Sequence, residues 1–190
     1  MASKIDICNR ALTKAGASVI SEFDDASAES IAANQEYDGT LNGALVRYPW
    51  RFACRQKKLV KLSADPEARF ASAYQMPADC LHMRAVVDTG DKPVRYEIYE
   101  DRILTDCTGD LWAEYTFRAA EAHFPPLFVN ALVLDLAASF KQALMDDQKA
   151  AQALRSEAES LYWPRAQTAE AQSRTSRRVQ TSRFITVRRQ

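Results

Sequence analysis

The chain has 190 residues with 47% apolar content, which is enough to bury one sizeable core or two small ones. Its formal net charge is zero, but six of its 25 basic residues lie in the last 20 residues, where there is no acidic residue. No uninterrupted apolar run approaches the roughly 18 residues that cross a bilayer, and the N-terminal residues lack a signal-peptide core. We therefore expect an acidic, soluble body with a basic tail that folds in a bacterial cytoplasm.

A first helix is predicted over Ser3–Ala15, where apolar residues recur at helical spacing until Gly16, a residue suited to the left-handed conformation that ends helices. A second helix is predicted from about Ala26 to Arg47, with a cap from the polar residues at 24–27. Its glycines, Gly39 and Gly43, either weaken it by about 1 kcal/mol each relative to alanine or allow a close contact or a kink. Its predicted buried stripe comprises Ile31, Tyr37, Leu41, Ala44, Leu45 and Tyr48.

The second helix runs into an aromatic corner made of Tyr48, Pro49, Trp50 and Phe52. Proline has no backbone donor and moves the preceding residue out of helical dihedrals, so the helix must end at about Tyr48. Three large rings so close together indicate that at least two of them are buried where a helix meets a sheet. The four residues are therefore predicted to form a structural helix-to-sheet corner.

Residues 51–118 are predicted to form an antiparallel β-rich lobe, because apolar and polar side chains alternate and turn-forming sequences separate the runs. A basic, strand-like run follows the corner, and further strands are expected near 81–87, 94–99, 102–105 and 111–118. The simplest topology is a meander, in which each strand pairs with the next along the chain.

Two more helices are predicted beyond residue 119. Residues 127–140 are apolar at all but three positions, so this helix should be buried on nearly all sides at the centre of a bundle. The last helix should begin at Asp146 or Asp147 and stop or kink at Pro164. Its expected buried residues are Leu154, Ala158, Leu161 and Tyr162.

These elements predict the α+β class. About four helices from residues 1–50 and 119–165 should form one bundle, because the helices at both ends of the chain pack together. The β-rich lobe at 51–118 is inserted between them, and residues 166–190 are expected to form an extended, basic C-terminal arm.

The composition of the C-terminal arm indicates a binding partner, because the arm combines six arginines with a few apolar residues and has no helical stripe to bury. One interpretation is a solvated terminus. A second is that the arm orders against another protein by added-strand pairing, with Phe184 and Ile185 as apolar anchors. A third is phosphate binding to nucleic acid. The candidate partner-binding residues are Arg174, Arg177, Arg178, Arg183, Phe184, Ile185, Arg188 and Arg189.

Few residues indicate catalysis. The sequence has no Gly-x-Ser-x-Gly, no glycine-rich phosphate loop and no His-Glu-x-x-His, and its histidines, His82 and His123, lie far apart. The widely spaced cysteines form no Cys-x-x-Cys pair, which argues against a zinc site or a disulfide framework. We expect no enzymatic activity, no cofactor and no metal. A small hydrolase, the alternative, needs a pocket that gathers a histidine with Cys80 or a carboxylate.

An ordered series of short motifs resembles the head-to-tail adaptor of short-tailed, podovirus-like bacteriophages, the tail tubular protein A family. The resemblance spans about Ile5 to Tyr162. Two departures are Met76, where a leucine is expected, and the glycine-rich segment at 39–43. The matching pieces are Ala11–Ala17, Ser30–Asp38, Tyr48-Pro49-Trp50-Arg51-Phe52-Ala53, Ala73–Leu81, Ile103–Asp106 and Phe124–Leu132.

The resemblance implies a virion protein whose copies form a dodecameric ring between the portal protein and the tail nozzle protein. The ring would extend the DNA channel, through which DNA passes without sequence-specific binding. The resemblance also implies a helical bundle that carries a β-rich lobe, synthesis in the host bacterial cytoplasm and no contact with a membrane. The alternative is a nucleic-acid-binding protein that uses its arginine-rich tail.

Overall fold

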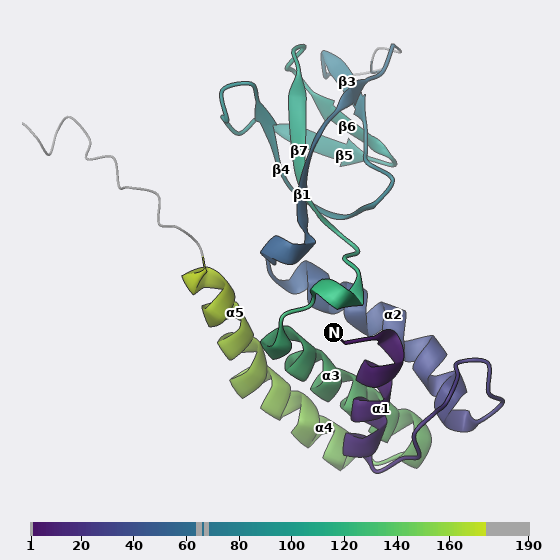
Figure 1. Ribbon diagram of the computed structural model, residues 1–190. Coiled ribbons are helices and arrows are strands. Elements are labelled where there is room, and N and C mark those ends of the chain that lie inside the picture. Colours follow the sequence, from purple (N-terminus) through teal and green to yellow (C-terminus); the bar gives the residue numbers. More distant parts are fainter. Residues whose placement is uncertain (1, 64–65, 67–68, 174–190) are drawn as a thin grey trace, which may run out of the picture.

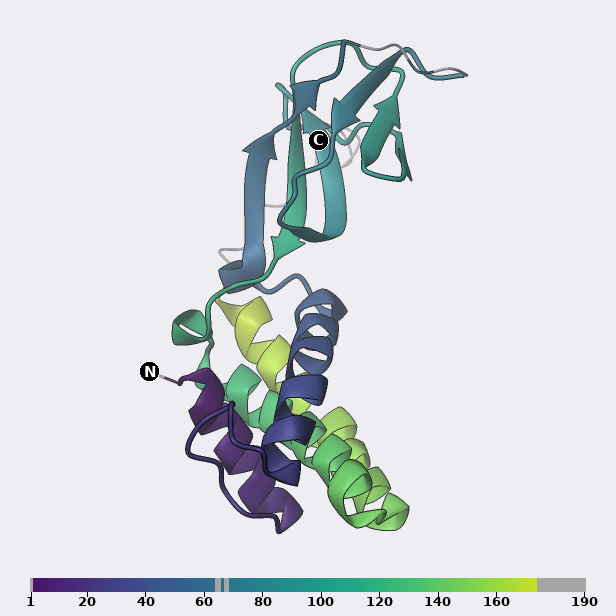
Figure 2. The same ribbon diagram turned by 90° about the vertical axis from the view of Figure 1, so that its right-hand side faces the viewer.

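The computed structural model describes residues 2–63, 66 and 69–173, which form a mixed α+β fold and confirm the expected class. Helices from both ends of the chain lie together and form a helical lobe, and the strands of the middle segment form a β lobe beyond one end of it (Figure 1). The view turned by 90° shows the same separation (Figure 2). The chain enters the β lobe near residue 54 and leaves it near residue 117.

Helix α1 spans Lys4–Ala15, as the periodicity predicted to within one residue. The Ser3 side chain accepts a hydrogen bond from the Asp6 backbone, and the Asp6 carboxylate accepts one from the Ser3 backbone, which completes a capping box. Gly16 ends the helix in the left-handed conformation with φ of 81°. Both boundaries therefore follow from local chemistry.

Helix α2 spans Ala28–Arg47, with Ser27 as its N-cap and extended dihedrals at Tyr48, immediately before Pro49. The predicted stripe is correct for Tyr37, Leu41, Ala44 and Leu45, which are buried. It is wrong for Ile31, which is 51% exposed. Six residues along a helix correspond to a rotation of roughly 240° from Tyr37, so Ile31 points away from the buried face.

Helix α3 spans Pro126–Met145 and is the central helix of the helical lobe, as predicted. It packs against α1, α2 and α4, and half of its residues are buried. By length and composition α3 could cross a membrane, and it is the single such helix in the part of the chain that the structure describes. More than half of its apolar window is buried inside the fold, as in the core helix of a globular protein.

The C-terminal helix is longer than expected and has a wide turn in its middle. Helix α4 spans Gln148–Glu157, a π-helical turn η3 covers Ala158–Tyr162, and helix α5 covers Trp163–Gln172. The expected extended arm is therefore wrong for residues 166–172, which are helical. Pro164 does not stop the helix, because the wider π turn accommodates the proline ring and the carbonyl groups that lose their donor.

Burial along this helix also differs from the prediction. Ala158 is buried, but Leu161 is 37% exposed, and Leu154 and Tyr162 are half-buried. The π turn adds extra residues to one turn of the helix and so rotates the residues that follow it. Trp163, which is only 1% exposed, takes the inward position instead.

The β lobe contains two antiparallel sheets. The first has the order β1-β7-β4 and the second the order β2-β3-β6-β5, so the predicted simple meander is wrong. The β5–β6 hairpin is sequential, but β7 pairs with both β1 and β4. The strands are β1 Cys54–Lys58, β2 Val60–Lys61, β3 Ser72–Gln75, β4 Cys80–Asp88, β5 Tyr96–Tyr99, β6 Arg102–Thr105 and β7 Leu111–Phe117.

A second, smaller core lies between the two sheets, separate from the core of the helical lobe. Tyr74 and Tyr115 are buried there, and each hydroxyl has a partner at the edge of the core. The Tyr74 hydroxyl donates to the Gly109 carbonyl at 2.6 Å, and the Tyr115 hydroxyl donates to the Asp79 carboxylate at 2.8 Å. The β lobe is therefore held by its own apolar contacts and satisfied polar groups.

Arg84 on β4 connects the two lobes directly. Its Nη2 donates to the Val46 carbonyl at 2.7 Å and to the Tyr48 carbonyl at 3.2 Å, at the C-terminal end of α2. Its Nε donates to the Thr116 hydroxyl on β7 at 3.0 Å. A cation that satisfies the last carbonyl groups of a helix is favourable both for hydrogen bonding and for the helix dipole.

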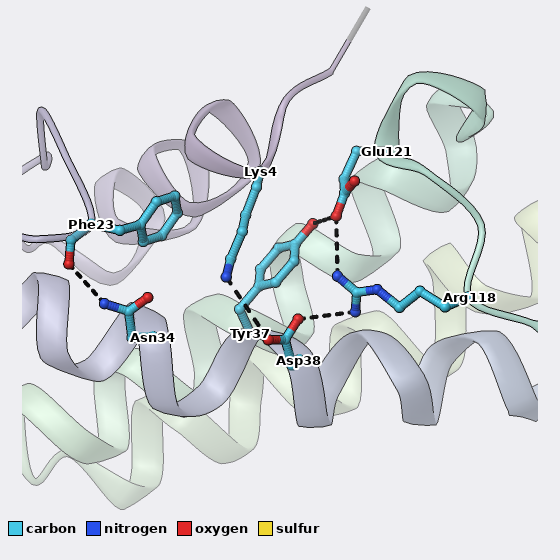
Figure 3. A network of polar contacts seen from close by, with 7 residues as sticks. All are labelled: Lys4, Phe23, Asn34, Tyr37, Asp38, Arg118 and Glu121. Atoms are coloured by element: carbon cyan, nitrogen blue, oxygen red, sulfur yellow. Dashed lines mark hydrogen bonds and ion pairs between the residues drawn. The ribbon is translucent and has the colours of Figure 1, made fainter. Parts of the chain in front are cut away.

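A polar network holds the segment that leads from β7 back to α3 against the helical lobe (Figure 3). Arg118 donates to the Asp38 carboxylate of α2 at 2.9 Å and to the Glu121 carboxylate at 3.3 Å. Glu121 lies on the short helix η2 (Glu121–His123) and accepts a hydrogen bond from the Tyr37 hydroxyl at 3.2 Å. Lys4 of α1 lies 3.9 Å from Asp38. The network thus joins α1, α2 and the segment that leads from β7 to α3.

Candidate interaction site at the aromatic corner

The aromatic corner lies where the chain leaves α2 and enters the β lobe. Trp50 is 1% exposed, and its Nε1 donates to the Ala44 carbonyl of α2 at 2.9 Å. Tyr48, Pro49 and Phe52 are half-buried. The prediction that at least two of the three rings are buried is wrong, because only Trp50 is buried, whereas the Tyr48 and Phe52 rings lie at the boundary between the lobes and keep part of their surface in solvent.

Rings from distant segments gather around this corner. Trp50 lies 5.2 Å from Phe128 of α3 and 6.0 Å from Trp163 of α5, measured between ring centroids. Phe52 lies 5.0 Å from Phe128 and 5.6 Å from Phe124. The edge-on arrangement of several pairs is the geometry that aromatic quadrupoles favour, worth about 0.5–1.5 kcal/mol per pair beyond burial. The corner therefore binds the first turns of α3 and α5 to the end of α2.

Arg51, inside the corner, fixes the C-terminal end of α5. Its backbone N–H donates to the Glu170 carboxylate at 2.7 Å, and its Nη1 donates to the Ser173 carbonyl at 2.7 Å. A guanidinium at the last carbonyl groups of a helix is favourable, because those groups have no partner within the helix and carry the negative end of its dipole. The corner thus holds the last described turn of α5.

The structure brings together one of the two candidate sets of residues. Tyr48, Pro49, Trp50 and Phe52 form one corner, and the last described residue, Ser173, lies against it. The candidate partner-binding residues of the arm lie outside the described residues. They are Arg174, Arg177, Arg178, Arg183, Phe184, Ile185, Arg188 and Arg189.

An apolar groove of about 370 Å³ lies beside this junction, between the N-terminal end of α3 and the last turns of α5. Leu127, at its rim, is 40% exposed, and Pro125 and Pro126 give one wall a fixed backbone. On the other side Ala166 and Ala169 lie one helical turn apart, and their small side chains leave the groove open. Sequence reasoning missed this groove because residues 166–172 were expected to be extended. The Ala166–Ala169 spacing was the available signal.

A polar cleft of about 350 Å³ lies on another face, where α2, α3 and the π turn meet. Arg47 donates two hydrogen bonds to the Glu159 carboxylate, and its guanidinium lies 4.9 Å from the Trp163 ring centroid. The Trp163 Nε1 donates to the Asp135 carboxylate at 2.9 Å. Burial raises the pKa of Asp135, whereas the hydrogen bonds from Arg47 lower the pKa of Glu159. These groups satisfy one another, which is the arrangement of a structural ion-pair network.

The alternative of a hydrolase requires a histidine close to Cys80 or a carboxylate. His82 and His123 are exposed and lie on β4 and on η2. Burial raises the pKa of the Cys80 thiol, which disfavours the reactive thiolate. Within residues 2–63, 66 and 69–173, no cluster of three or more His, Cys, Asp or Glu side chains could hold a metal ion.

The chain was also compared with known proteins. No protein-family model matches it, and a search of curated proteins found no match.

Proposed function

We propose that this chain is a structural virion protein, the head-to-tail adaptor of a short-tailed bacteriophage. One observation carries the proposal: one of the resembling motifs, Tyr48-Pro49-Trp50-Arg51-Phe52-Ala53, occupies a junction that joins both lobes and holds the end of α5. A motif whose residues contact so many elements fits a protein that works by presenting rigid surfaces, rather than by chemistry.

In this role, copies assemble as a dodecameric ring between the portal protein and the tail nozzle protein, in the neck of the virion. A ring requires heterologous contacts, in which one face of a subunit meets a different face of the next. The helical lobe and the β lobe supply two such surfaces at opposite ends of the subunit. The β lobe is the candidate seat for the nozzle or a neighbour, and the C-terminal arm is the candidate contact with the portal.

The charge balance fits a DNA conduit. Residues 1–170 carry an excess of acidic groups, and a channel wall that repels phosphate lets DNA slide without adhering. A ring whose channel wall was lined by arginine side chains would overturn this part of the proposal.

The proposal is tested by mixing the purified chain with its cognate portal ring and separating bound from free chain by size. A variant in which the six arm arginines are changed to glutamine serves as the comparison, and Arg95→Gln with Arg102→Gln in the β lobe is a control for lost charge. We expect the wild-type chain and the control to bind the ring, and the arm variant to bind more weakly.

The nucleic-acid alternative predicts a different pattern. A DNA-binding arm gives duplex affinity that falls steeply with salt, because each neutralised phosphate releases counterions. Binding of duplex DNA by the wild-type chain without any binding to the portal would reject the adaptor role and favour the alternative.

A further inference from the structure

The apolar groove beside the aromatic corner has no occupant among the described residues, although its walls are apolar and partly exposed. Leu127, Ala166 and Ala169 face this groove of about 370 Å³, and the polar groups at its rim are Glu170 and Ser173. The groove can take an apolar partner, because each apolar side chain left in water forgoes favourable burial.

The chain itself carries a segment that matches this groove. Beyond Ser173, the sequence Arg183-Phe184-Ile185-Thr186-Val187-Arg188 places apolar residues between two arginines. Glu170 offers a carboxylate at the rim, which accepts a hydrogen bond from the Arg51 backbone N–H, while the Arg51 guanidinium donates to the Ser173 carbonyl. A phenylalanine or isoleucine in the groove, with an adjacent arginine beside Glu170, satisfies both the apolar walls and the charge at the rim.

Chain length and sequence favour a groove on a second copy. Ten residues lie between Ser173 and Phe184, and the eleven steps from one Cα to the next reach up to roughly 36–40 Å in an extended chain, more than the length of α3 at about 30 Å. A return to the chain's own groove requires a reversal within residues 174–183, where Ser176 and Ser182 are the residues common in turns and there is no glycine, proline, asparagine or aspartate.

We propose that Phe184 and Ile185 of one copy dock into the groove between α3 and α5 of the neighbouring copy. This inference rests on the proposed function in one respect, because it assigns the arm's apolar anchors to a neighbouring subunit and leaves the remaining arginines for the portal. The contact is heterologous, since arm and groove are different surfaces, and repetition of it around an axis closes a ring.

The test uses the full-length chain with the photoreactive residue benzoylphenylalanine in place of Phe184. Equal amounts of this chain and of ¹⁵N-labelled wild-type chain are mixed, irradiated with and without the portal ring, and the cross-linked peptides are identified by mass spectrometry. Isotope composition distinguishes links between copies from links within one chain. We expect links between copies that map to Leu127 and to residues 166–170.

Two groove variants sharpen the test. Ala169→Trp fills the groove from an exposed position on α5, and we expect it to reduce the links between copies about tenfold or more, the effect of excluding one phenylalanine from an apolar site. Thr168→Trp, one residue away and outside the groove, is the matched control and should leave the links unchanged.

Links confined to one chain, links from residue 184 to the portal alone, or no links in either preparation each contradict the inference. Portal binding by size is measured in parallel. Portal binding without links between copies contradicts this inference but supports the adaptor role. Links between copies without portal binding support this inference but contradict the adaptor role.

Discussion

At the scale of single residues, Arg51 has the most unusual position, because one residue satisfies both a carboxylate and the last carbonyl of α5. We predict that Arg51→Ala raises hydrogen–deuterium exchange in the last turn of α5 but lowers the free energy of unfolding by no more than about 1 kcal/mol, the usual value of an exposed helix-end cation. Its backbone bond to Glu170 survives the change.

The matched control for this prediction is Arg165→Ala, an exposed arginine in the first half of α5. It should leave exchange at residues 169–173 unchanged. Equal exchange in Arg51→Ala and the wild-type chain would show that the corner does not hold the last described turn of α5.

The Arg47–Glu159 pair gives a prediction about pH. The hydrogen bonds from Arg47 lower the pKa of folded Glu159 below its ordinary value of 4.5, so the pair stabilises the fold above pH 4.5 and the stabilisation is lost as pH falls through the lowered pKa. We expect Glu159→Gln to cost up to about 1 kcal/mol at pH 7 and progressively less as the pH falls below 4.5, measured by urea unfolding at a series of pH values. Glu157→Gln, which removes an exposed carboxylate two residues earlier at the end of α4, is the matched control. A constant difference between Glu159→Gln and wild type would contradict the assignment.

At the scale of elements, the glycines of α2 have no structural requirement in the single chain. A Cβ atom built at Gly39 or Gly43 meets no heavy atom within 4 Å, and both positions are exposed, so neither a close helix contact nor a strained dihedral demands glycine. We predict that Gly39→Ala and Gly43→Ala each raise the free energy of unfolding by about 0.5–1 kcal/mol, because alanine restricts the unfolded chain. Chemical denaturation measures this, and a loss of stability in either variant would contradict it.

The sequence predicted helix boundaries better than it predicted the arrangement of strands, for a physical reason. Ser3, Gly16, Ser27 and Pro49 act on their own neighbours, so a cap or a stop is visible in a few residues. The pairing of β7 with β1 and β4 depends on contacts between distant segments, which no local pattern encodes.

Two other elements were missed for related reasons. Strand β3 was not predicted because three of its four residues, Ser72, Ala73 and Tyr74, are buried and hide the alternation of a half-exposed strand. The π turn before Pro164 was also missed, because its sequence looks like that of an ordinary helix. The continuation of the helix past Pro164 is therefore seen only in the folded structure. The groove of the candidate site depends on that continuation, and it was therefore missed as well.

At the scale of the whole molecule, Arg84 sets how the lobes meet, because it contacts the end of α2 and both β4 and β7. We predict that Arg84→Met, which keeps most of the side-chain volume, costs about 1–3 kcal/mol by leaving the carbonyl groups of Val46 and Tyr48 without this donor. We also expect small-angle X-ray scattering of this variant to show a broader distribution of the maximum dimension of the molecule than the wild-type chain shows. Arg95→Met, exposed in the β lobe, is the control, and equal scattering from both variants would contradict a role in lobe orientation.

The proposed function requires that copies of this chain form a ring on the portal. The most direct measurement is the native mass of the complex formed when excess purified chain is added to the cognate portal ring. The account predicts a single complex that contains a dodecamer of this chain on each portal ring. A portal ring that keeps its own mass, with all of the added chain unbound, would contradict it.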